Sequence, residues 1–170
     1  MSGDHVKRAG DGPSPVGDEP VDDAPVDPRG EHLRRALGAR DAAARVRHAD
    51  AGLGLRLAPA CLDPEVGMLL ERQRYLGHLE LGDLEAAEAA AARMVASGAM
   101  ADVAKHDHAR VLLALGRRDE AISAQRAAAA AAPRARRSFH LWCAATFEAG
   151  GGDLEGALET LAAARRVSTR

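Results

Sequence analysis

The feature that most constrains this chain is a short glycine-containing string that occurs three times. The strings begin at Gly82, Gly116 and Gly152, which lie 34 and then 36 residues apart. Five residues after each glycine stands a small residue: Ala87, Ala121 and Ala157. Glycine lets one helix end in a left-handed turn, an acid after it can cap the next helix, and alanine permits close packing. Such a period is typical of helix pairs that stack to bury their apolar faces.

Composition also favours helices. Alanine supplies 39 of the 170 residues, there is one isoleucine, and only 2% of the chain is aromatic. Alanine is the strongest helix former, and the β-branched and aromatic residues that suit strands are scarce. The sequence therefore predicts an all-α fold. It predicts helices over six ranges: Pro64–Leu81, Leu84–Ser97, Met100–Leu115, Asp119–Ala132, Arg134–Ala149 and Leu154–Arg166.

Residues 1–30 differ from the rest of the chain. They contain five of the eight prolines and seven acids against three basic residues, with almost no large apolar side chain. Such a segment cannot bury enough surface to offset its ordering entropy. We expect an acidic disordered tail over 1–30 and a helical domain over 31–170.

The repeated strings resemble the tetratricopeptide repeat family, whose 34-residue unit is a helix–turn–helix. The second unit carries the resemblance most fully, through Leu115-Gly116, Glu120-Ala121-Ile122, Ala128 and Pro133. The units cover about 68–101, 102–135 and 136–170. The resemblance implies helix–turn–helix repeats stacked as a short right-handed α-solenoid.

A degenerate unit over 31–67 is also possible. In this interpretation Glu31–His48 forms the first helix, and the stretch from Ala49 to Pro64 forms the second. Pro59 lies inside the second helix, where proline costs about 3 kcal/mol, so a kink or a loop is an equal alternative.

The resemblance also implies a function. In that family the first helices of stacked pairs line a concave groove that receives a peptide or a helix of a partner protein. A groove lined by apolar and cationic side chains suits a peptide that carries apolar side chains and an acidic group. Transferred to this chain, the groove is lined by Leu69, Arg72, Leu76, Leu79, Val103, His106, Arg110, Leu113, Arg137 and His140.

Catalytic and metal-binding signals are weak. The sequence has no GxSxG, no glycine loop followed by lysine, and no HExxH. His106 and His108 are two residues apart and diverge on a helix, so they do not form a chelating pair. We expect no catalytic site, no cofactor and no metal. A metal-dependent enzyme that uses the histidines is the least favoured alternative.

Charge and cysteine content limit the partners and the compartment. The formal charge of −2 gives no overall basic field for nucleic acid, and no apolar run approaches the roughly 18 residues that span a bilayer. Cys61 and Cys143 form no disulfide framework, and no secretory signal is visible. We expect a cytoplasmic adaptor or scaffold that binds a protein partner.

Two further expectations stay open. The chain could instead be a regulatory helical domain of a bacterial transcription or signalling protein, an analogy at the level of the fold. Terminal units of a stack need a polar outer face, and no polar capping helix follows Leu154–Arg166. The C-terminal end is therefore expected to be a contact surface, with homo-oligomers as one outcome.

Overall fold

The described part of the chain is entirely helical. The computed structural model describes residues 27–168 and contains no strand within them. A short 3₁₀ turn, η1 (Pro59–Cys61), joins the second and third helices. The helices are α1 (Arg29–Leu37), α2 (Ala42–Leu53), α3 (Pro64–Leu81), α4 (Leu84–Ser97), α5 (Ala101–Ala114), α6 (Arg118–Ala131), α7 (Arg134–Gly150) and α8 (Leu154–Ser168).

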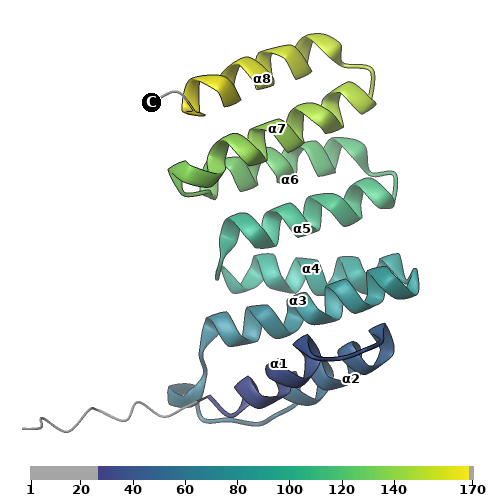
Figure 1. Cartoon of the computed structure of the whole chain (residues 1–170), viewed down its shortest axis with the longest axis vertical. Helices are drawn as coiled ribbons and strands as arrows, with labels where there is room; N and C mark the ends of the chain where they lie inside the picture. Colours follow the sequence, from purple (N-terminus) through teal and green to yellow (C-terminus); the bar gives the residue numbers. More distant parts are fainter. Residues whose placement is uncertain (1–26, 169–170) are drawn as a thin grey trace, which may run out of the picture.

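Consecutive helices pack on one another to form an elongated stack. The contacts run from α1 against α2 through to α7 against α8, and α1 also touches α3. Figure 1 shows the helices following one another along the long axis, with α1 and α2 at one end and α8 at the other. The expected stack of helical pairs is confirmed, and it contains four pairs: α1/α2, α3/α4, α5/α6 and α7/α8.

The repeated strings form the turns inside the last three pairs. Gly82, Gly116 and Gly152 adopt φ values of 76°, 78° and 90°, a conformation that side chains other than glycine rarely adopt. The Asp83 and Asp153 carboxylates accept hydrogen bonds from the Ala86 and Gly156 amides at 3.0 and 2.9 Å. The predicted glycine stop is present in all three turns, and the acidic cap is present after Gly82 and Gly152 but not after Gly116, where Arg117 precedes α6 without a side-chain cap. All six predicted helices form within two residues of their expected bounds.

The degenerate unit is a helical pair, but its boundaries differ from those expected. The first helix ends at Leu37 rather than His48, and the second is α2, which ends at Leu53. Gly38 and Asp41 separate the two helices, and the Asp41 carboxylate accepts a hydrogen bond from the Ala44 amide at 2.7 Å. Pro59 lies in η1, so the loop alternative is the correct one.

Close approach of the second and third helices depends on a glycine. A Cβ atom at Gly77 would lie 2.5 Å from Cγ2 of Val46 and 3.1 Å from the Ala42 carbonyl oxygen. Because real Cβ contacts are not this short, any larger residue at position 77 would push α2 away from α3. The glycine therefore fixes how the first pair sits on the second.

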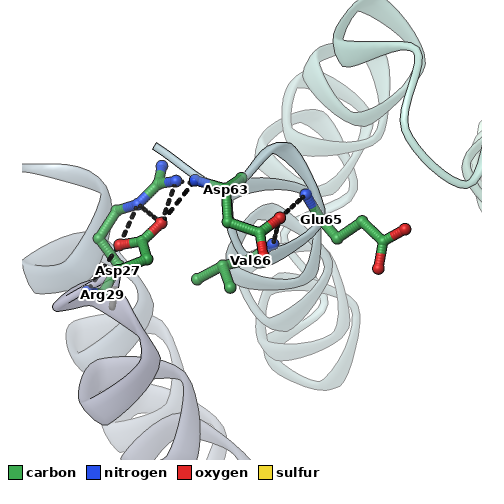
Figure 2. Close-up of polar contacts among 5 residues, drawn as sticks. All are labelled: Asp27, Arg29, Asp63, Glu65 and Val66. Atoms are coloured by element: carbon green, nitrogen blue, oxygen red, sulfur yellow. Dashed lines mark hydrogen bonds and ion pairs between the residues drawn. The ribbon is translucent and has the colours of Figure 1, made fainter. Parts of the chain in front are cut away.

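A polar cluster attaches the start of the described chain to α3 (Figure 2). Arg29 Nη2 donates to the Asp27 carboxylate at 2.6 Å and to the Asp63 carbonyl oxygen at 2.8 Å. The Asp63 amide donates to Asp27 at 2.9 Å, while the Asp63 carboxylate caps α3 through the Glu65 amide at 2.8 Å. The Arg29 hydrogen bond lowers the pKa of Asp27 to about 2.

The helical domain begins earlier in the chain than the predicted boundary. Arg29 and Gly30 belong to α1, so the helical part begins two residues before the expected boundary at Glu31. Asp27 and Arg29 are attached to α3 because they pair with each other and with the Asp63 backbone. Residues 1–26 of the tail that was expected over 1–30 lie outside the described part of the chain.

The interior combines apolar packing with buried ion pairs. The main apolar cluster joins α3, α4 and α5 through residues such as Met68, Tyr75, Met94 and Val111. Elsewhere each of three buried carboxylates pairs with an arginine of a neighbouring helix: Asp107 with Arg72, Asp102 with Arg136, and Glu148 with Arg126. No helix of residues 27–168 is long and apolar enough to cross a membrane.

Candidate functional site on the first helices

The predicted groove residues of α3 and α5 share one partly exposed surface. Those of α3 recur at spacings of three or four residues, as do those of α5, so each set lies on one side of its helix. None of the eight is fully buried, and Arg110 is exposed. We call this surface, with its continuation on α7, the first-helix face. Its predicted members on α3 and α5 are Leu69, Arg72, Leu76, Leu79, Val103, His106, Arg110 and Leu113.

A buried carboxylate joins α3 to α5 beneath this face. Asp107 is 1% exposed, and its Oδ2 atom accepts a hydrogen bond from Arg72 Nε at 2.7 Å. Arg110 Nη1 lies 3.9 Å from the other carboxylate oxygen, and the Arg110 side chain is 52% exposed. Arg72 therefore has a structural partner, whereas most of the Arg110 side chain faces solvent.

A hydrogen-bonded network joins α5, α6 and α7. His106 Nδ1 donates to Gln125 Oε1 at 2.9 Å, and Gln125 Nε2 donates to His140 Nδ1 at 3.2 Å and to the His140 carbonyl oxygen at 3.1 Å. Gln125 and His140 are buried, and His106 is half-buried. The structure thus brings two predicted site residues, His106 and His140, to one buried glutamine.

His140 also faces an ion pair between α5 and α7. Its Nε2 atom lies 3.4 Å from Asp102 Oδ2, and Arg136 Nε lies 2.9 Å from the same oxygen. Burial lowers the pKa of His140, and the nearby His106 and Arg136 side chains act in the same direction, while Asp102 opposes them. A neutral imidazole that accepts from Gln125 and presents Nε2–H to Asp102 satisfies this arrangement.

Two aromatic residues of α7 extend the first-helix face. Phe139 is 49% exposed and Trp142 is 55% exposed. The Phe139 ring packs edge-on against His106 of α5, with ring centroids 5.4 Å apart, which places it beside the predicted α5 residues. Trp142 follows one helical turn later, on the same side of α7. Large exposed aromatic side chains grouped with cations are typical of binding surfaces.

The sequence pattern did not identify these aromatic residues as part of the site. They belong to an i, i+3, i+4 stripe that predicts a core-facing side of the helix. Cys143, next to Trp142, is indeed buried, and burial raises the pKa of its thiol. α6 and α8 cover two sides of α7, and the apolar residues of α7 outnumber the positions that these helices cover. The excess reaches the surface at Phe139 and Trp142.

The two predicted groove residues of α7, Arg137 and His140, are not exposed on the first-helix face. His140 is 3% exposed and therefore supports the face from within. Arg137 is exposed but lines a hollow of 540 Å³ between α7 and α8, together with Arg134 and Arg166. It also lines a second hollow between α6 and α7, beside Arg126. These contacts place Arg137 beside the second helices of the pairs, away from Phe139.

The side chains of the first-helix face are of the kinds that bind a ligand. Among residues 27–168, no group of three or more histidine, cysteine or acidic side chains is placed to hold a metal ion. The first-helix face instead combines leucines, two aromatic rings and the exposed guanidinium of Arg110. Such a surface can hold apolar anchors of a ligand and attract a carboxylate.

Comparison with known proteins leaves the family open. The chain matches no model of a known protein family, and no curated protein matches it significantly. Membership of the tetratricopeptide repeat family therefore stays a prediction from the repeated strings and the resemblance that they carry.

Proposed function

We propose that this protein is a non-catalytic interaction module, similar to tetratricopeptide repeat proteins, that binds a peptide or helix of a partner protein. The proposed binding surface is the first-helix face of α3, α5 and α7. Its role is that of an adaptor or scaffold, and its proposed location is the cytoplasm, where its two free cysteines would stay reduced.

The observation that carries the proposal is the exposure of Phe139 and Trp142 on α7, where the Phe139 ring contacts His106 of α5. The tryptophan is the only one in the chain, and 55% of its side chain is exposed. Tryptophan and arginine are the residues most enriched at positions that dominate binding energy in protein interfaces. An unused surface would expose polar side chains at these α7 positions, because buried and exposed faces normally alternate in polarity.

The chemistry of the face predicts the ligand. Leu69 and Leu76 on α3, with Leu113 on α5, offer apolar contacts that are partly exposed. Arg72 is held by Asp107, so Arg110 is the cation best placed to receive an acid. We expect a segment with two or more apolar side chains and a carboxylate, bound across α3, α5 and α7.

The proposal is tested by selecting random displayed peptides on the full chain and measuring the affinity of the best binder by calorimetry. We expect the selected peptides to share apolar anchors and an acid. The variant Trp142→Ala should weaken binding by about tenfold or more, because truncating a tryptophan at an interface commonly costs over 1.4 kcal/mol. Arg110→Gln should weaken binding less, and mainly at low salt.

Matched controls lie on other faces of the molecule. Leu37 on α1 is 64% exposed, and Arg47 on α2 is also exposed. Leu37→Ala and Arg47→Gln should leave the affinity unchanged, and circular dichroism should show all four variants equally helical. Peptides that bind Trp142→Ala as tightly as the unmodified chain would exclude the first-helix face as the binding surface.

A further inference from the structure

An apolar stripe on α8 is uncovered. Leu154, Leu158 and Leu161 are 65%, 68% and 40% exposed. Their spacing of four and three residues places them along one side of the helix. A neighbouring side of α8, about a quarter turn from the leucines, is buried against its own pair through Ala157, Thr160 and Ala164. No element of residues 27–168 packs on the leucine stripe, which therefore lies open to solvent.

The same positions carry the contacts between pairs elsewhere in the stack. Thirty-six residues before the leucines stand Arg118, Ile122 and Gln125 of α6. Arg118 donates to the Gly150 carbonyl oxygen of α7 at 2.5 Å, and Gln125 donates to His140 of α7. The leucine stripe is thus the surface that, in the preceding pair, receives the next helix.

A charged stripe runs beside the leucines. Glu155, Glu159 and Arg166 recur at spacings of four and seven residues, so they share one flank of α8. The flank is acidic in the N-terminal half of the helix and basic at its C-terminal end. Such a flank is complementary to itself when a second copy of the helix runs in the opposite direction.

We propose that the leucine stripe is a dimer interface, in which α8 packs antiparallel against α8 of a second copy of this chain. With the two-fold axis near Thr160, Leu158 lies opposite Leu161 of the second copy, and Glu155 lies opposite Arg166 of the second copy. The two helix dipoles are then antiparallel as well. A parallel pair would bring the two acidic ends together, which is why the antiparallel direction is preferred.

This interface is separate from the first-helix face. The leucines lie on α8, whereas the proposed peptide site lies on α3, α5 and α7 with Trp142 as its main aromatic side chain. Failure of one proposal therefore leaves the other standing. Trp142→Ala is a direct check, because it should weaken peptide binding without changing self-association.

The first test is sedimentation of the full chain over a concentration series. We expect a shift from monomer to dimer with rising concentration, and Leu158→Glu should raise the dimer dissociation constant at least tenfold. Leu158 is 68% exposed, so the substitution should leave folding intact, which circular dichroism checks. Leu37→Glu, an equally exposed leucine on α1, is the matched control and should dimerise normally. A monomer up to high micromolar concentration overturns the proposal, as does a dimer that Leu158→Glu leaves unchanged.

The second test addresses the direction of the helices. Glu155→Arg and Arg166→Glu should each weaken the dimer, because each places like charges opposite one another. Combining both changes should restore the dissociation constant close to that of the unmodified chain. Arg166 lines a hollow with Arg134 and Arg137, so its reversal brings no like charges together within the monomer. A combined variant as weak as the single ones overturns the antiparallel arrangement.

Discussion

The α4–α5 and α6–α7 junctions occupy equivalent places in the stack but are held together differently. Ala91 and Met94 of α4 correspond to Gln125 and Ala128 of α6, 34 residues later. All four are fully buried. At the first junction Met94 belongs to an apolar cluster with Ala104 and Val111 of α5, while at the second Gln125 bonds to histidines of α5 and α7.

The difference shows that equivalent junctions between helices can be packed either with apolar side chains or with a hydrogen-bonded polar network. An apolar junction gains its stability from buried surface and close packing. A polar junction must satisfy each buried donor and acceptor, and in return it fixes the relative positions of its helices. The polar junction lies directly beneath Phe139, so the hydrogen-bonded junction is also the part of the stack that presents the aromatic side chains.

The largest expected effect is on the apolar junction. Met94→Ala should lower the free energy of unfolding by about 3 kcal/mol, because it leaves a cavity among packed apolar side chains. Urea unfolding followed by circular dichroism measures the change. Leu37→Ala, at a 64% exposed position, should change the stability by about 0.5 kcal/mol or less. A loss below about 1 kcal/mol for Met94→Ala would mean that the junction is loosely packed.

A smaller loss is expected at the polar junction. Gln125→Leu should lower the free energy of unfolding by about 2 kcal/mol, because it leaves ring nitrogens of His106 and His140 without their partner. The same unfolding measurement applies. An equal or higher stability in the variant would show that the network contributes only specificity, as buried polar groups do in some proteins.

Alkaline pH should destabilise the apolar cluster that joins α3, α4 and α5, because Tyr75 of α3 belongs to this cluster. Burial raises the pKa of Tyr75 to about 12, and the nearby negative charge of Asp107 adds to the shift. An unfolded chain loses this proton near pH 10, so stability is complete below pH 10 and falls by up to about 2 kcal/mol as the pH approaches 12. Tyr75 is the only tyrosine, so the phenolate absorbance reports it alone. Tyr75→Phe should remove this pH dependence, and ionisation of the folded protein near pH 10 would contradict the burial.

Acid pH should destabilise the polar junction through protonation of His140. This is the smallest of the expected effects on stability. Burial holds the pKa of His140 below its ordinary value of 6.5. An unfolded chain therefore takes up the proton first, so the stabilising contribution is complete above pH 6.5 and is lost as the pH falls below it. An NMR titration of the assigned imidazole measures the shift directly. A pKa above 6.5 would show that Asp102 outweighs burial and that His140 is charged in the network.

Much of the fold could be predicted from local signals. Gly82, Gly116 and Gly152 need a positive φ, and Asp63, Asp83 and Asp153 accept from the amides that begin the next helix. These features act over a few residues, so the sequence alone reveals them. The pair α1/α2 was less clear: Asp41 is the same kind of start signal, but Gly38 ends α1 with a φ of −85°, outside the left-handed region.

The site was only partly predictable, because it depends on which helices are neighbours. Periodicity places Leu76 with the other predicted residues of α3, and Arg110 with those of α5. Both residues are on the first-helix face. Periodicity cannot tell that α7 is covered on two sides, which buries His140 and leaves Trp142 exposed. Nor does it show that Gln125, 15 residues before His140, bonds to it.

The central claim is that the first-helix face binds a polypeptide, and Trp142 fluorescence tests it most directly. The chain contains one tryptophan, so its emission reports this surface without labelling. On titration with the tightest selected peptide, we expect the emission to shift to the blue and quenching by acrylamide to decrease, both saturating at the affinity measured by calorimetry. A peptide that binds in calorimetry and leaves both the emission and the quenching unchanged would place the binding surface elsewhere and contradict the account.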